Sequence, residues 1–139
     1  MKILVIDGQG GRLGRSLIES IRKACPAATI IAVGTNSMAT ENMMNSNCAD
    51  HLATGENAVL VACRTAGIIV GPVGIAMADA MMGEITPAMA NAVASSPACR
   101  VLIPMNLCQT RIAGVSKGSA AILEDAVRQV KELTDKAQA

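Results

Sequence analysis

Three glycines at intervals of three residues follow a short apolar run near the start of the chain, and they constrain the fold more than any other feature. The run Ile3–Ile6 is typical of a buried strand, and Asp7 ends it. Gly8, Gly11 and Gly14 come next, and the residues after them place their apolar side chains on one side of a helix. A strand, a glycine turn and a helix in this order predict a βα unit with a phosphate-binding turn. Glycine lets an anion approach the backbone, and the first N–H groups of the helix face that anion.

The spacing of these glycines is a variant of the common dinucleotide-binding pattern. Leu13 stands where Gly-x-Gly-x-x-Gly would place its last glycine, so the motif here is Gly-x-x-Gly-x-x-Gly. This variant is seen in extended and atypical short-chain reductases, and residues 8–18 also resemble the opening of dihydrodipicolinate reductases. The resemblance is limited to the first part of the chain and implies an NAD(P)-binding Rossmann domain. A glycine turn that binds no ligand remains the alternative.

Composition excludes several classes of function. The chain has 139 residues, of which 51% are hydrophobic and 17% charged, as expected for one folded domain. Its net charge is +1, it has no run of Lys or Arg, and it contains no Phe, Trp or Tyr, so a nucleic-acid partner is not expected. No apolar run is long enough to span a membrane, and no signal peptide is visible. We therefore expect a cytoplasmic protein that binds neither nucleic acid nor membranes.

The cysteines and the single histidine do not predict a metal site. The five cysteines, an odd number, are widely spread and are expected to be reduced (Cys25, Cys48, Cys63, Cys99 and Cys108). Cys48 and His51 form only half of a tetrahedral zinc site, which one of the other cysteines would have to complete. Buried cysteines usually serve as small hydrophobic side chains, and we predict no metal. His51 is expected at the surface or at the edge of a sheet.

Apolar runs and helical patterns alternate along the chain. The expected strands are residues 3–6, 29–33, 50–53, 68–70, 100–103 and 110–115. The expected helices are residues 16–23, 38–47, 58–64, 75–82, 88–94 and 120–136. Strands that are almost uniformly apolar and that alternate with helices indicate a parallel sheet covered on both faces. We predict one α/β domain over residues 1–139, a Rossmann-like three-layer α/β/α sandwich with a mostly parallel sheet.

The turns that follow the strands are rich in Gly, Pro and small polar residues. In a parallel sheet these turns meet at one edge, where ligands of such folds bind. The predicted cofactor-binding residues are therefore taken from these turns: Asp7, Gly8, Gln9, Gly10, Gly11, Arg12, Leu13, Gly14, Thr35, Asn36, Ser37, Thr54, Gly55, Glu56, Asn57, Gly71, Pro72, Gly74 and Asn106. The expected ligand is a phosphate-bearing small molecule.

The second turn bears on which dinucleotide this would be. NAD sites usually carry an acidic residue at the end of the second strand, and residues 34–37 contain none. Arg12 or Arg15, with Thr35 and Ser37, would suit a ribose 2′-phosphate, so NADP is favoured over NAD. The alternative is that the two arginines are solvated and that Thr35, Asn36 or Ser37 only caps the next helix.

Two carboxylates near these turns have more than one interpretation. Asp7 would bind Mg²⁺ or a ribose hydroxyl, or would cap the glycine turn through hydrogen bonds to backbone N–H groups, and capping is favoured. Glu56 is expected in the first turn of a helix, where its charge interacts favourably with the helix dipole.

Motifs spread over nearly the whole chain resemble one family of small bacterial proteins that is classed as a domain of unknown function. They are the stretches Val-Ile-Asp-Gly-Gln-Gly-Gly, Gly-Thr-Asn-Ser-x-Ala-Thr, Ala-Thr-Gly-Glu-Asn-Ala, Gly-Pro-x-Gly-Ile and Gly-Glu-Ile-Thr-Pro-x-Met-Ala. The resemblance implies a complete protein rather than a fragment of a reductase, and it implies no activity.

Three functions remain open from the sequence. The first is a nucleotide- or dinucleotide-binding protein. The second is a small oxidoreductase or transferase with a site completed by oligomerisation, whose catalytic groups would come from Asp7, Glu56, Asn57, Asn106 or Cys108. The third is an interaction module without a ligand, which methionines 77, 81, 82 and 89 would suit, although ordinary core is the favoured interpretation of that cluster. Mean hydropathy of +0.40 with no aromatic residue favours a homo-oligomer.

Overall fold

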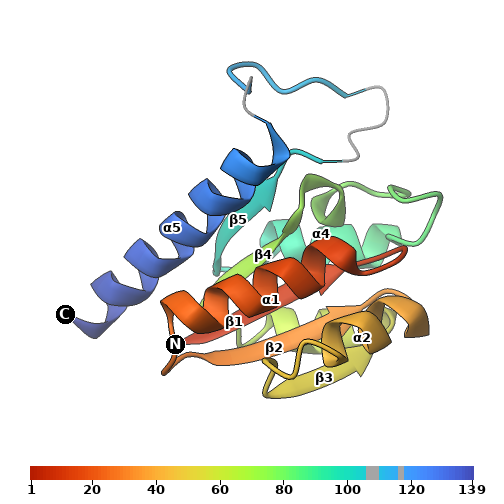
Figure 1. The fold of residues 1–139 in the computed structure, drawn as a ribbon. Helices are drawn as coiled ribbons and strands as arrows, with labels where there is room; N and C mark the ends of the chain where they lie inside the picture. Colours follow the sequence, from red (N-terminus) through yellow and green to blue (C-terminus); the bar gives the residue numbers. More distant parts are fainter. Residues whose placement is uncertain (106–109, 116–117) are drawn as a thin grey trace.

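Parallel strands form the centre of the molecule. The computed structural model describes residues 1–105, 110–115 and 118–139, and within them the sheet has five strands in the order β3-β2-β1-β4-β5, all parallel (Figure 1). The strands are β1 (Lys2–Asp7), β2 (Thr29–Gly34), β3 (His51–Thr54), β4 (Ile68–Pro72) and β5 (Cys99–Ile103). The prediction of a parallel sheet is confirmed.

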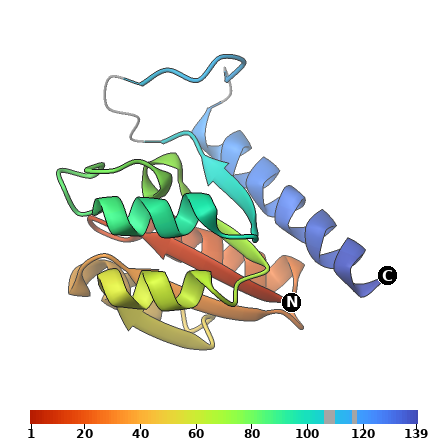
Figure 2. The ribbon, with the colours of Figure 1, turned by 180° about the vertical axis from the view of Figure 1, so that it is seen from behind.

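Helices cover both faces of the sheet. They are α1 (Arg12–Ala24), α2 (Ser37–Met44), α3 (Glu56–Cys63), α4 (Pro87–Ser95) and α5 (Ser119–Gln138), with a short 3-10 helix, η1 (Val73–Ala76). Helices α1, α2 and α5 lie on one face and α3 and α4 on the other, as Figures 1 and 2 show from opposite sides. This is the predicted three-layer Rossmann-like arrangement. None of the helices in the described ranges is long and apolar enough to cross a membrane.

Alternation along β1 explains why the sheet needs helices on both sides. Ile3 and Val5 pack into the cluster beneath α1 and α5, while Leu4 and Ile6 pack into the cluster beneath α3 and α4. All four side chains are fully buried. Burial of a large aliphatic side chain stabilises the folded protein by about 1.5–3 kcal/mol. A strand whose side chains are apolar on both faces gains this stabilisation in full only at the centre of a sheet that is covered on both sides.

The strand order reverses between β1 and β4. The chain moves outward from β1 through β2 to β3, then crosses the other face through α3 and returns beside β1 as β4. The register pairs Asp7 with Gly34 and Pro72 with Ile103, so the carboxyl ends of the strands meet at one edge. In open α/β sheets ligands bind at such a reversal, and the predicted convergence of the turns is present in the described part of the chain.

The methionine-rich helix predicted for residues 75–82 is wrong. The helical turn there is η1, which ends at Ala76, and turns follow it. Asp79, Met81 and Met82 have φ values of 64°, 56° and 56°, which a right-handed helix does not allow. The apolar spacing suggested a helix, but the segment turns back toward the glycine turn.

The last predicted strand, residues 110–115, is also wrong. These residues form no strand and include a turn at Ala113 and Gly114, where Gly114 has φ +83°. A strand would need several consecutive residues in extended conformation, and the left-handed glycine interrupts them. The other strands and helices lie where the sequence placed them, with ends that shift by a few residues.

Candidate functional site

Asp7 fixes the conformation of the glycine turn. It is the last residue of β1 and is 5% exposed. Its Oδ1 accepts a hydrogen bond from the N–H of Gly8 at 2.8 Å, and its Oδ2 accepts one from the N–H of Gly14 at 2.7 Å. The side chain thus connects the two ends of the turn, and it satisfies an N–H in the first turn of α1 that has no partner within the helix. These contacts are those expected if Asp7 caps the glycine turn through hydrogen bonds to backbone N–H groups.

The environment of Asp7 opposes its ionisation. Burial raises the pKa of the Asp7 carboxyl above its ordinary value, against the hydrogen bonds from Gly14 and Gly8, which lower it. The nearby carboxylate of Glu84 raises it further. A buried carboxylate with two N–H donors and a second carboxylate beside it is therefore a group that holds its proton more tightly than an ordinary aspartate.

Two glycines of the motif allow close packing. Gly11 has φ +71°, and a Cβ there would lie 2.6 Å from the carbonyl oxygen of Ala39 in α2. A Cβ on Gly14 would lie 2.6 Å from Sδ of Met43 and 2.8 Å from Cβ of Asp7. Helices α1 and α2 pack together and onto the sheet through these positions. The glycine spacing that predicted a pyrophosphate close to the backbone is therefore also required for packing within the protein.

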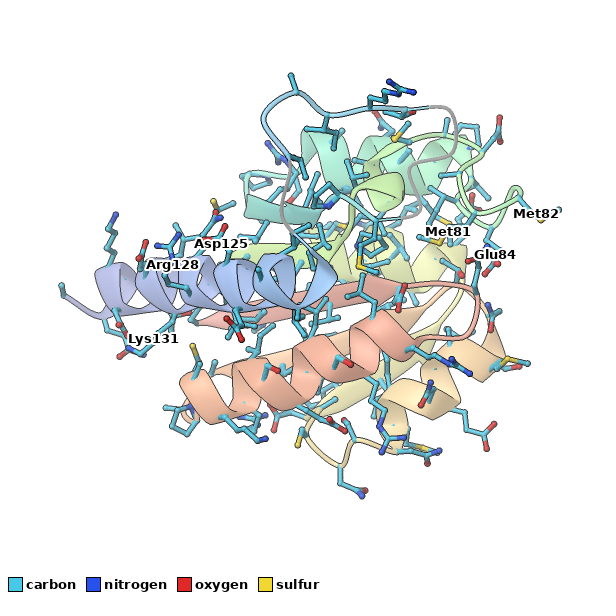
Figure 3. The ribbon with its side chains drawn as sticks, turned by 45° about the horizontal axis from the view of Figure 1, so that its top comes forward. Met81, Met82, Glu84, Asp125, Arg128 and Lys131 are labelled. Carbon is cyan, nitrogen blue, oxygen red and sulfur yellow. The ribbon has the colours of Figure 1, made fainter. Side chains whose placement is uncertain are left out.

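Glu84 is a site residue that sequence reasoning missed. It lies between η1 and α4, and its Oε1 accepts three hydrogen bonds: from the N–H of Gln9 at 2.9 Å, from Oγ1 of Thr35 at 2.7 Å and from Nδ2 of Asn36 at 2.7 Å. Figure 3 labels it at the end of the molecule where the glycine turn lies. The sequence signal for Glu84 is the motif Gly-Glu-Ile-Thr-Pro. Glu84 stands 75 residues after Gln9, so no local pattern connects this motif with the glycine turn.

These donors favour the ionised form of Glu84. Partial burial opposes ionisation, but the hydrogen bonds from Thr35, Gln9 and Asn36 together outweigh it and lower the pKa of the carboxyl. Asn36 also caps α2, since its side chain accepts a hydrogen bond from the N–H of Ala39 at 2.8 Å. The turns after β1 and β2 are therefore linked by one charged carboxylate from a distant segment.

A pocket of about 380 Å³ opens at the glycine turn. Its lining is Asp7, Gly8, Gln9, Gly10, Gly11, Arg12, Leu13, Met81 and Met105. The N–H groups of Arg12 and Leu13 begin α1, where a helix has no intrahelical acceptor for them. The volume is within the range of small-ligand pockets. A larger hollow of about 470 Å³ lies along β5 and α5 and contains none of the predicted site residues.

The remaining predicted residues divide into four groups. In the turn after β3, the hydroxyls of Thr54 and Thr40 share a hydrogen bond of 2.7 Å, and Glu56 accepts one from Thr86 at 2.6 Å. Gly55 is the N-cap of α3, and Asn57 is exposed in the first turn of that helix. Gly71 and Pro72 in β4 and Gly74 in η1 are buried. Ser37 is exposed and is the first residue of α2. Asn106 and Cys108 lie outside the described residues.

The structure brings the residues of the first two turns together at the pocket, while the third turn is hydrogen-bonded to the second, from the N–H of Gly55 to the carbonyl of Gly34 at 2.9 Å, and does not line the pocket. Residues 8–13, Thr35 and Asn36 surround Glu84 and the pocket. Thr54 and Glu56 belong to the turn after the edge strand β3, beyond β2 from the glycine turn. His51 is exposed on that edge strand, and no group of three or more metal-ligating side chains occurs in the described part of the chain. The binding role of the site residues stays a prediction.

The predicted cofactor is corrected. A solved structure of a dodecameric FMN-dependent UbiX-like decarboxylase from Escherichia coli O157:H7 matches with a TM-score of 0.47 and 14% identity, over 100% of this chain and 95% of that one. Its description names FMN rather than NADP or NAD, so the nicotinamide prediction is wrong against this comparison. Glu84 gives a physical reason against NADP, because the Thr35 hydroxyl assigned to the 2′-phosphate donates to a carboxylate.

Comparison with known families agrees with the motifs found along the sequence. The search of the curated proteins returns no match. The family model described as "Domain of unknown function (DUF3842)" matches residues 2–135, which is nearly the whole chain. The chain therefore belongs to the DUF3842 family.

Proposed function

We propose that this protein binds a phosphate-bearing small molecule of the nucleotide class in the pocket at the glycine turn. The observation that carries the proposal is the position of this pocket. It lies at the carboxyl end of β1, beside the reversal of strand order, and six consecutive residues, 8–13, line it. Ligands of open α/β sheets bind in this place.

The chemistry of the lining suits a phosphate next to an apolar group. The N–H groups of Arg12 and Leu13 stand at the positive end of the helix dipole, and Arg12 is exposed at the turn. Met81 and Met105 line the pocket with polarisable thioethers, which suit the flat face of a heterocycle in a chain without aromatic residues. The proposal covers binding and assigns no reaction.

Assembly and location are part of the same proposal. We infer a homo-oligomer, supported by large apolar side chains at the surface, of which Met82 is 97% exposed and Met38 is 66% exposed. Size-exclusion chromatography with light scattering tests this, and a monomer at high micromolar concentration would contradict it. We also infer a cytoplasmic location, supported by the free thiols of Cys25, Cys48, Cys63 and Cys99.

The test of ligand binding uses a position where a side chain can be added without disturbing the fold. A Cβ on Gly10 would meet nothing within 4 Å, although Gly10 lines the pocket. Gly10→Glu therefore places bulk and negative charge where the phosphate would bind. Ala27→Glu adds the same charge in the exposed turn between α1 and β2, at the opposite edge of the sheet, and is the matched control.

Thermal shift and calorimetry with ATP, GTP, FMN and coenzyme A give the readout. A ligand in excess of its dissociation constant raises the melting temperature of the protein by mass action. At least one of these probes should stabilise the wild type and Ala27→Glu and should not stabilise Gly10→Glu. The proposal fails if no probe binds the wild type, or if Gly10→Glu binds with unchanged affinity while it remains folded.

A further inference from the structure

Residues 77–86, here called the strap, connect η1 to α4 and lie against the glycine turn. Their fold is held internally by backbone hydrogen bonds from Asp79 N–H to the Ile85 carbonyl at 2.8 Å and from Gly83 N–H to the Asp79 carbonyl at 3.1 Å. At the far end Thr86 caps α4 and donates to Glu56. Figure 3 labels Met81, Met82 and Glu84 of the strap at one end of the molecule.

Two side chains of the strap contact the glycine turn. Glu84 takes the three hydrogen bonds from Gln9, Thr35 and Asn36 described above. Sδ of Met81 lies so close to Gly8 that a Cβ there would be 2.6 Å from it, and Met81 also lines the pocket. One carboxylate and one thioether thus hold the strap against the pocket.

The backbone of the strap is under conformational strain in this position. Asp79, Met81 and Met82 all have positive φ. The left-handed conformation is unfavourable for an L-residue, and it persists only where surrounding contacts impose it. Met82 is 97% exposed, so its side chain contributes little to the packing of the strap. The hydrogen bonds of Glu84 therefore hold in place a segment whose own backbone would favour other conformations.

The position of Glu84 is also a position for an anion. An N–H, a hydroxyl and an amide N–H₂ converge on a single carboxylate oxygen, and each of these groups can donate equally well to a phosphate oxygen. A phosphate in the neighbouring pocket would meet like charge from Glu84. The release of Glu84 would remove that repulsion and would leave three donors for the ligand.

We propose that the strap is an autoinhibitory latch, in which Glu84 occupies the anion position formed by Gln9, Thr35 and Asn36 until an anionic group of the ligand displaces it. This inference rests on the proposed nucleotide binding and adds its regulation. Displacement ends the close contact of Met81 with Gly8 and widens the pocket, which Met81 continues to line. Because only the open form binds, the latch lowers the apparent affinity by the fraction of molecules that are open.

The first experiment uses no ligand. Glu84→Gln keeps the shape of the side chain and removes its charge, so the three donors hold the strap less strongly. Asp79→Asn is the matched control: it removes the same charge from the same segment, Asp79 is exposed, and Asn tolerates positive φ. Hydrogen exchange of the amides of residues 77–86 should be about tenfold faster in Glu84→Gln than in the wild type and Asp79→Asn. Equal exchange in all three proteins would overturn the latch.

The second experiment measures affinity for inorganic phosphate, FMN and ATP by calorimetry. Glu84→Gln should bind the responsive probe about fivefold more tightly than the wild type does, and Asp79→Asn should bind as the wild type does. Equal or weaker binding by Glu84→Gln would overturn the competition between Glu84 and the ligand. If no protein binds any probe, the proposed function fails, and the exchange rates still decide whether Glu84 fastens the strap.

Thr35→Val separates the latch from a structural role of the same contacts. It removes one of the three donors, so the strap should exchange faster, as in Glu84→Gln, while the affinity for the anion should fall instead of rise. In the wild type, saturating ligand should speed exchange in residues 77–86 and slow it at Gln9. Protection of the strap by the ligand would show a segment that closes over its ligand and would overturn the proposal.

Discussion

The carboxylate of Asp7 accepts a hydrogen bond of 2.7 Å from the N–H of Gly14, seven residues further along the chain. Its other oxygen accepts from Gly8, so one side chain closes the turn between β1 and α1. Three of the turn's N–H groups, those of Gly8, Gln9 and Gly14, are directed at carboxylates of the protein itself. Contacts within the protein itself thus hold the turn in this geometry.

Loss of the Asp7 carboxylate should destabilise the fold. Asp7→Ala leaves the buried N–H groups of Gly8 and Gly14 without an acceptor, and we expect the free energy of unfolding to fall by about 1–3 kcal/mol. Asp7→Asn keeps one acceptor oxygen and should lose less. Urea unfolding at neutral pH measures both, and an Asp7→Ala protein within about 0.5 kcal/mol of the wild type would contradict the capping role.

Gly14 and Gly10 should respond in opposite ways to an added methyl group. Gly14→Ala forces its Cβ against Cβ of Asp7, which the strand holds in place, and should cost about 1–3 kcal/mol of stability by overpacking. Gly10→Ala meets open space and should be neutral or slightly stabilising, by up to about 1 kcal/mol. Urea unfolding of Gly14→Ala, Gly10→Ala and the wild type measures the two changes in the free energy of unfolding. Equal effects would mean that packing around α1 does not explain the glycine spacing.

The stability that Glu84 contributes should depend on pH. The pKa of Glu84 is lowered in the folded protein, so its contribution is present above the ordinary glutamate value of about 4.3 and is lost as the pH falls through the lower folded value. Asp7 acts in the opposite direction, because its raised pKa favours the folded state at low pH and loses that contribution as the pH rises. The difference in unfolding free energy between the wild type and Glu84→Gln should therefore shrink below about pH 4.3. A difference that stays constant down to about pH 3 would contradict this assignment.

Arg22 should resist replacement even by lysine. Its guanidinium donates to the carbonyls of Cys48, Pro26 and Ala28 and to the carboxylate of Asp50 at 2.6 Å. Lysine cannot direct several donors in one plane, so Arg22→Lys should cost about 1–3 kcal/mol. Arg128→Lys on α5 provides the comparison, since the ion pairs of Arg128 are exposed and their loss should change the stability much less than Arg22→Lys does. Thermal or urea unfolding of both variants tests the contrast.

Most elements of the fold could be predicted because their signals are local. Ile3–Ile6 and 68–70 are short apolar runs bounded by Gly or polar residues, and Thr86 before Pro87 marks the start of a helix; each lies close to its predicted place. The errors fall where tertiary contacts decide the conformation. Residues 75–82 have the apolar spacing of a helix, but three of them take positive φ where the strap lies against the glycine turn. Glu84 could not be assigned a role, because its partners stand far away along the chain.

The sequence by itself determined most of the strands and helices along the chain, the parallel sheet and the glycine turn after β1. These depend on apolar periodicity and on glycine at fixed local spacing, both of which can be read within one segment. The tertiary structure alone decided which groups occupy that turn. Asp7 and Glu84 reach its N–H groups only after β1, α1 and the strap have packed together. Contacts between distant segments depend on this packing, and no local pattern encodes them.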